Sequence, residues 1–191
     1  SKWITDEVSR YEVQKLRNKY DAILTSSSTV IKDNPSLTCR IEGGKNPVRI
    51  ILDSHLRTQP DNKVYNNDGT KVIIITENVN LEKKFPSNVT ILQCRLKNNK
   101  IDLKEAVNLI YKEGIRSILI ESGGTLNNSF IQEGLADKLI QFIAPKILSD
   151  NDGISFSQGC NRENISECNN IRIDSVEKLK NDVVLTGYFK Y

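Results

Sequence analysis

The sequence predicts an α/β fold: a mixed, mostly parallel sheet with helices on both faces and an antiparallel hairpin at the C-terminal end. Strand candidates such as 48–52 and 71–76 are apolar along most of their length instead of alternating with polar residues. That pattern is typical of strands buried on both faces. Helical patterns are interleaved with the strand candidates along the chain, which favours parallel pairing. Two further strand candidates, 171–176 and 183–189, are expected to form the hairpin, joined across 177–182.

The N-terminal part of the chain predicts a helix, a strand and two turns. The helix is expected over 6–20, with Thr5 as a candidate N-cap. A short strand at 22–25 follows. It runs into a polar turn at 26–29 and a second turn at Asp33-Asn34-Pro35.

Two more helices are expected in the middle of the chain. The better defined one covers 103–113, because Asp102 and Glu105 form a capping box and Gly114 stands at its exit. The second is expected near 125–133. Strands are expected at 48–52, 71–76, 89–92, 117–120 and 138–143, a loop at 61–69, and irregular structure over 149–170.

Length and charge narrow the class of protein. The chain has 191 residues, which fits one domain, 1–191. Its formal net charge is +3, and the charges are interspersed without the basic stripe of a nucleic-acid binder. The apolar runs are too short to span a bilayer. We therefore expect neither a nucleic acid nor a membrane as a partner.

The cysteines indicate a reducing compartment. Cys39, Cys94, Cys160 and Cys168 include no C-x-x-C pair, and His55 is the single histidine. This spacing argues against a metal site, so we expect none. Free thiols are typical of the cytoplasm. We therefore expect a cytoplasmic protein.

Candidate ligand contacts follow the strands, because open α/β sheets bind ligands beyond the carboxyl ends of their strands. Glu121 and Gly123-Gly124 follow the strand at 117–120. Two glycines let the backbone approach a ligand, and the free N–H groups of the next helix suit phosphate. An ordinary strand–helix turn is the alternative, which the spacing alone favours. Glu121 is a candidate for contacting sugar hydroxyls or for transferring a proton, with a solvated strand end as the alternative.

Two arginines are candidates for binding a phosphate. A guanidinium matches phosphate with two parallel hydrogen bonds, so Arg17 and Arg40 suit this role, with surface charges as the alternative. Arg17 directly follows Leu16 of the apolar stripe, which favours an inward orientation. Asp33 is typical of a turn, and His55 is interpreted as a loop residue.

Six stretches, taken in order, resemble the reductase domain of the riboflavin-biosynthesis deaminase/reductase family. No single stretch is specific, but the combination is. They are SKWIT at 1–5, KLR at 15–17, DAILTSSSTVIKDNPSLTCR at 21–40, RIILDSHLRT at 49–58, ILIESGGTLNNSFIQEGLADKL at 118–139 and IAPKIL at 143–148.

The resemblance implies a dihydrofolate-reductase-like fold and a defined reaction. The reaction is the NADPH-dependent reduction of the ribosyl group of 5-amino-6-(5-phosphoribosylamino)uracil to ribityl. The hydride would go to the sugar carbon attached to the amine, after the ring opens to an imine. In such enzymes the protein orients the cofactor and the substrate.

The resemblance also implies roles for individual residues. On the substrate side, Ser1 and the two arginines would hold the phosphate and Glu121 the ribose; the full set is Ser1, Arg17, Leu37, Arg40 and Glu121. The cofactor side would consist of Trp3, Thr29, Asp33, Ser54, Gly123, Gly124, Thr125, Leu126, Asn127, Asn128 and Ser129. Glu121 and Asp33 are the catalytic candidates.

Three departures from the family pattern bear on these expectations. The zinc deaminase half is absent, so we expect no deaminase activity in this chain and expect a deaminase as a fused or paired partner. The first reductase strand, with a lysine and an S-x-D-G turn, is also absent, so we expect the chain to begin inside the domain. Ser26 and Ser28 stand where glycines are common, and their side chains would crowd the nicotinamide.

Two other functions stay open from the sequence. One is a reductase of the same fold that acts on the non-deaminated pyrimidinone or on a pterin. Arg17 and Arg40 would separate these substrates, since a pterin has no phosphate. The other is a non-catalytic domain that dimerises or positions a deaminase. The paired end strands and the resemblance favour a homodimer.

Overall fold

The structure, a computed structural model, describes residues 3–79, 82–147, 149, 153–160 and 162–191. The chain divides into two compact units. We name Gln14–Ser122 the sheet unit. We name Ser1–Val13 together with Gly123–Tyr191 the terminal unit.

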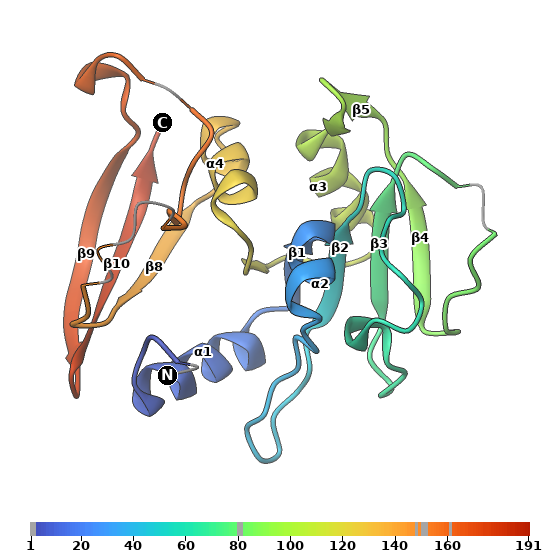
Figure 1. Cartoon of the computed structure of the whole chain (residues 1–191), viewed down its shortest axis with the longest axis horizontal. Helices are drawn as coiled ribbons and strands as arrows, with labels where there is room; N and C mark the ends of the chain where they lie inside the picture. The colour runs from blue at the N-terminus through green and yellow to red at the C-terminus, as the bar shows by residue number, and fades with distance from the viewer. Residues whose placement is uncertain (1–2, 80–81, 148, 150–152, 161) are drawn as a thin grey trace. The chain divides into compact units, whose positions relative to one another are not determined.

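The sheet unit contains a five-stranded parallel sheet, which confirms the predicted fold class (Figure 1). The strand order is β4-β3-β2-β1-β7, so β1 lies between β2 and β7. The carboxyl ends of these three strands therefore meet at one edge of the sheet. The strands are β1 (Ala22–Ser26), β2 (Val48–Leu52), β3 (Val72–Thr76), β4 (Val89–Gln93) and β7 (Ile118–Ile120).

A helix stands where the sequence predicted a polar turn. Helix α2 (Ser27–Asp33) begins directly after β1 and ends at Asn34, which has a left-handed φ of 41°. The expected turn at 26–29 was wrong because serine is also a favoured N-cap residue. The Ser26 hydroxyl accepts a hydrogen bond from the Thr29 N–H and so caps α2.

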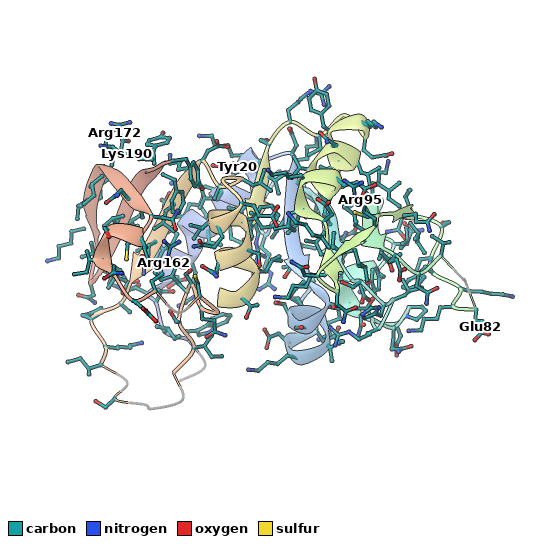
Figure 2. The ribbon with its side chains drawn as sticks, turned by 90° about the horizontal axis from the view of Figure 1, so that it is seen from above. Tyr20, Glu82, Arg95, Arg162, Arg172 and Lys190 are labelled. Atoms are coloured by element: carbon teal, nitrogen blue, oxygen red, sulfur yellow. The ribbon has the colours of Figure 1, made fainter. Side chains whose placement is uncertain are left out.

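The strands are apolar because both faces of the sheet are covered. Alternate residues of neighbouring strands, Ile23, Ile51 and Ile74, pack in one cluster with Val30 of α2. Helix α3 (Leu103–Lys112) buries its own apolar face. Figures 1 and 2 show α2 and α3 on opposite sides of the strands. Strand residues that point to either side are therefore buried.

The predicted helices are present, with small shifts at their ends. Helix α1 (Glu7–Lys19) begins in the terminal unit and ends in the sheet unit. The Asp102 carboxylate caps α3 by accepting the N–H groups of Lys104 and Glu105. Four short elements were not expected: β5 (Leu96–Lys97), β6 (Lys100–Ile101) and the 3-10 turns η1 (Lys63–Tyr65) and η2 (Ile165–Glu167).

The terminal unit is built on a three-stranded antiparallel sheet in the order β8-β10-β9. These strands are β8 (Lys138–Ile143), β9 (Asn170–Leu179) and β10 (Asp182–Lys190). The hairpin is present, but its connection is only Lys180–Asn181, shorter than the predicted 177–182. Polar Glu177 and Lys178 had indicated a loop, yet they continue β9 as exposed residues of an edge strand.

Asp182, at the start of β10, ties the hairpin to the beginning of α1. Its carboxylate is buried and accepts hydrogen bonds from the Asp6 N–H and the Ser9 hydroxyl, both at 2.6 Å. The terminal unit also contains α4 (Gly124–Gln132), where a helix was predicted. Among the described residues, no helix has the length and apolarity needed to cross a bilayer.

Candidate functional site

Arg17 and Glu121 form a bidentate ion pair at the carboxyl end of β7. Arg17 Nε donates to Glu121 Oε1 at 2.9 Å, and Nη2 donates to Oε2 at 2.6 Å. Arg17 Nη1 donates to the Thr38 carbonyl at 3.0 Å. The two side chains are 13% and 26% exposed. Arg17 thus points inward from α1, and Glu121 meets it from the sheet.

Arg40 lies on the segment that follows Thr38. Its N–H donates to Gln14 Oε1 of α1 at 2.9 Å. Its side chain is exposed and has no polar partner in the described part of the chain. The structure therefore brings Arg17, Glu121 and the Arg40 backbone to the same end of α1. The Arg40 guanidinium stays available to a ligand.

Leu37 differs from the other substrate-side candidates. Its side chain is 4% exposed and packs in the hydrophobic cluster of the sheet unit. Its φ of 52° is left-handed, which is rare for a branched residue. Only the Leu37 backbone can therefore face a ligand.

Thr29, Ser54 and Asp33 are the cofactor-side candidates of the sheet unit. Thr29 lies in the first turn of α2, and its hydroxyl is 3.2 Å from the Ser26 hydroxyl. Ser54 is the second residue after β2, next to buried Asp53, and is partly exposed. Asp33 is exposed at the opposite end of α2 from Thr29. The helix thus separates Asp33 from the strand ends.

A buried polar network fixes the turn after β2. Asp53 Oδ2 accepts hydrogen bonds from the N–H and the hydroxyl of Thr58, both at 2.8 Å. The Thr58 hydroxyl is 2.6 Å from the Tyr65 hydroxyl, and burial raises the pKa of that phenol. Asp53 Oδ1 is buried without a partner among the described residues. These contacts hold the turn that carries Ser54.

The glycine run at the start of α4 is partly covered by its own chain. A Cβ on Gly124 would lie 2.3 Å from the Ser155 carbonyl oxygen, which no backbone atom can accommodate. Gln158 N–H donates to the Gly124 carbonyl at 3.1 Å, and Asn127 Nδ2 donates to the Phe156 carbonyl at 2.9 Å. Gly124 is thus required by packing of the 155–158 segment.

The rest of this run is more open. A Cβ on Gly123 would meet no atom within 4 Å, and Thr125 is exposed. The Thr125 carbonyl accepts the Ser129 hydroxyl at 3.0 Å, while Asn128 Oδ1 lies 3.3 Å from the Ser157 hydroxyl. Leu126 is half-buried and donates its N–H to the Gly123 carbonyl.

The first residues of the chain hold the remaining two candidates. The Trp3 ring lies under the Arg10 guanidinium, 4.9 Å from the ring centroid, and the side chain is half-exposed. Ser1 lies outside the described residues. No group of three or more His, Cys, Asp or Glu side chains among the residues described could hold a metal ion.

The list of sequence candidates left out two side chains at this edge of the sheet unit. Gln14 lies one turn before Arg17 on the same face of α1, a spacing that could have identified it. Arg57 Nη2 donates to the Ser27 hydroxyl at 2.9 Å and so links the turn after β2 to the start of α2. Its place two residues after His55 gave no signal for that contact.

Comparisons with known proteins confirm the resemblance. Residues 1–185 match the family model described as RibD C-terminal domain. The riboflavin biosynthesis protein RibD of Actinobacillus pleuropneumoniae is 33% identical over 189 residues, which cover 97% of this chain and 50% of that protein. The 5-amino-6-(5-phosphoribosylamino)uracil reductase of Buchnera aphidicola subsp. Acyrthosiphon pisum is 34% identical over 161 residues, which cover 78% of this chain and 77% of that protein.

A solved structure agrees with this. The Thermotoga maritima diaminohydroxyphosphoribosylaminopyrimidine deaminase/5-amino-6-(5-phosphoribosylamino)uracil reductase superimposes with a TM-score of 0.83 at 29% identity, over 100% of this chain and 51% of that one. The chain spans about half the length of the first relatives it matches.

Proposed function

The chain belongs to the RibD C-terminal domain family, and on this premise we propose that it is an oxidoreductase of riboflavin biosynthesis. It reduces the ribosyl group of 5-amino-6-(5-phosphoribosylamino)uracil to ribityl. The Buchnera relative, 77% of which is covered by the match, is named for reduction of this compound. We further propose that residues 1–191 act as one reductase domain.

The Arg17–Glu121 pair beside the exposed Arg40 is the observation that carries the proposal. After three hydrogen bonds, the Arg17 guanidinium still has N–H groups to offer a phosphate. Arg40 supplies an unpaired positive charge. The Glu121 carboxylate has lone pairs beyond those that face Arg17, so it can also accept hydrogen bonds from ribose hydroxyls. Phosphate and ribose recognition thus stand side by side.

A reductase of this kind needs a nicotinamide cofactor, and we propose NADPH. The residues present fit a dinucleotide. In the sheet unit, Thr29 and Ser54 place hydroxyl groups just beyond the carboxyl ends of β1 and β2. In the terminal unit, a Cβ built on Gly123 would meet no atom within 4 Å. Bound NADPH would supply the hydride. The Ser26 hydroxyl lies 3.2 Å from the Thr29 hydroxyl, and the expectation that Ser26 and Ser28 crowd the nicotinamide stays a prediction.

We propose that two copies of the chain pair through β9. This strand has ten residues, forms one edge of the terminal sheet and leaves Ile173 58% and Val176 60% exposed. An open edge of that length pairs readily with another strand. We also propose a fused or paired deaminase, since the Thermotoga maritima neighbour carries that name. The free thiols of the described cysteines support a cytoplasmic location.

A substrate comparison tests the proposed function. NADPH consumption is followed with the phosphoribosylamino-uracil, with its non-deaminated pyrimidinone and with a pterin. The proposal expects the uracil to give the highest kcat/KM and the pterin to give none, because only phosphorylated substrates engage Arg17 and Arg40. A higher kcat/KM with the pyrimidinone or the pterin would show that this compound, and not the uracil, is the substrate. If none of the three compounds causes NADPH consumption, the chain is better explained as a non-catalytic domain.

A further inference from the structure

Three side chains on the C-terminal half of α1 hold the 38–45 segment by its backbone. Arg17 donates to the Thr38 carbonyl, Gln14 Oε1 accepts the Arg40 N–H, and Asn18 Oδ1 accepts the Lys45 N–H at 2.7 Å. Positions three and four residues apart lie on one face of a helix. This face of α1 therefore grips the segment at three successive points.

Of these three contacts, the one made by Gln14 is to Arg40 itself. Its side-chain oxygen lies 2.9 Å from the Arg40 nitrogen, and its own carbonyl lies 3.7 Å from Cys39 Sγ. Gln14 is half-buried, so water competes little for its amide oxygen. The Arg40 side chain has no polar partner in the described chain. The contact from Gln14 therefore fixes the backbone point from which this guanidinium reaches toward a ligand.

The charges at this end of α1 show why that position matters. Arg17 is neutralised by Glu121, to which it is joined by two hydrogen bonds. The net positive charge available to a phosphate therefore comes from Arg40. If the Arg40 backbone were mobile, its ordering would cost additional conformational entropy on binding, and a backbone already held avoids that part of the cost.

We infer that Gln14 is a positioning residue, which fixes the Arg40 backbone and so keeps its guanidinium placed for the phosphate of the substrate. The inference rests on the proposed function for its substrate. In this inference Gln14 has no contact of its own with the substrate. It acts through Arg40, and this dependence is what an experiment can detect.

A double-mutant cycle tests the inference. Gln14→Met removes the acceptor and keeps the side-chain length, Gln14→Glu keeps an acceptor oxygen, and Gln93→Met is the same chemical change at an exposed residue of β4. Each is measured with Arg40 intact and in an Arg40→Ala background. The readouts are kcat, the KM values of both substrates, and the Kd of ribose 5-phosphate from calorimetry.

With Arg40 intact, Gln14→Met should raise the KM of the phosphoribosyl substrate and the Kd of ribose 5-phosphate about fivefold, the effect of one hydrogen bond. The kcat and the KM for NADPH should not change. At an ionic strength that screens its added charge, Gln14→Glu should keep both values near those of the wild type, and Gln93→Met should change neither. In the Arg40→Ala background Gln14→Met should have no further effect. If Gln14→Met does not fold, Gln14→Asn withdraws the same acceptor.

An equal loss in both backgrounds, or no loss in either, would overturn the inference. A chain that binds ribose 5-phosphate in a Gln14-dependent way but reduces no pyrimidine would retain the inference and refute the proposed function. A chain that reduces the pyrimidine with a KM independent of Gln14 would do the reverse.

Discussion

Among the single residues, Arg40 stands out because its charge is exposed while that of Arg17 is matched by Glu121. Arg40→Ala should therefore raise the KM of a phosphorylated substrate at least about tenfold, the usual effect of a lost charged hydrogen bond. The melting temperature of the Arg40→Ala variant should stay within about one degree of the wild-type value, since the Arg40 side chain has no partner in the described chain. Steady-state kinetics and calorimetric melting check both. An unchanged KM would show that Arg40 does not bind the phosphate of the substrate.

The Arg17–Glu121 pair should contribute to stability more than a surface pair does. Glu121→Gln leaves a mostly buried guanidinium without its counter-charge, and we expect a loss of about 1–3 kcal/mol in the free energy of unfolding. Glu113→Gln is the matched control, because Glu113 pairs with Lys71, which is 43% exposed. That control should lose less than about 1 kcal/mol.

Urea unfolding measures both variants. Equal losses for Glu121→Gln and Glu113→Gln would show that the Arg17–Glu121 pair is no more than a surface contact. Glu121→Gln should also lower kcat/KM, whereas Glu113→Gln, which lies outside the proposed site, should not.

Among the secondary-structure elements, β1 and β7 are joined at their amino ends by Asp21. Its carboxylate accepts hydrogen bonds from the N–H groups of Arg116 and Ser117, at 3.0 and 2.9 Å. The hydrogen bond from the Arg116 backbone is the main cause that lowers the Asp21 pKa. Because the folded pKa lies below the unfolded value, this stabilisation is present above the unfolded pKa and is lost as the pH falls through the folded pKa.

The free energy of unfolding should therefore decrease as the pH is lowered below the usual aspartate range, and less steeply in Asp21→Asn. Urea unfolding between neutral and acidic pH measures the slope. Asp61→Asn, at an exposed residue that makes no hydrogen bond to the described chain, should keep the wild-type slope. Identical slopes for all three proteins would exclude Asp21 as a source of the pH dependence.

The start of α4 offers a matched pair of glycines. Gly124→Ala should lower the melting temperature by several degrees, because its Cβ would collide with the Ser155 carbonyl. Gly123→Ala should melt like the wild type, since its φ is −73° and nothing lies near the new Cβ. If the cofactor approaches Gly123, this variant should still weaken NADPH binding several-fold. Thermal melting measures the effect on stability, and NADPH titration measures the effect on binding. Normal NADPH binding by Gly123→Ala would show that the cofactor does not approach Gly123.

The sequence predicted the sheet well and the local contacts poorly. Strands such as β2 and β3 are signalled by their own composition, because burial on both faces demands apolar residues throughout. Helix α2 was missed because Ser26 is equally typical of a turn and of an N-cap. Gly124 was named as a cofactor residue by the resemblance, and no local pattern indicated the segment that packs on it, which lies some thirty residues later in the chain. Contacts of that separation leave no local signal.

For the candidate site too, the sequence identified residues but not the contacts between them. The resemblance named Arg17 and Glu121, but nothing in the sequence indicated that they bind each other. Leu37 was named as well, yet its side chain is part of the hydrophobic cluster. Gln14 was not named, because glutamine carries no chemistry of its own and its role depends on which backbone it meets.

For the chain as a whole, the proposed residues are distributed unevenly between the two units. The proposed substrate residues that the structure describes, Arg17, Leu37, Arg40 and Glu121, all belong to the sheet unit. The proposed cofactor residues belong to both units, with Thr29 in one and Gly123 in the other. Substitutions within the sheet unit are therefore the ones that should change substrate binding directly.

The most direct test of the reductase proposal follows the hydride itself. The chain, within its full natural protein, is incubated with 5-amino-6-(5-phosphoribosylamino)uracil and NADPH that carries deuterium at the transferable position. We expect the label on the sugar carbon attached to the amine of a ribityl product, and a much slower transfer when Arg17 and Arg40 are both replaced by Ala. An unlabelled product, a label on the pyrimidine ring, or an unchanged rate without the two arginines would contradict the proposal.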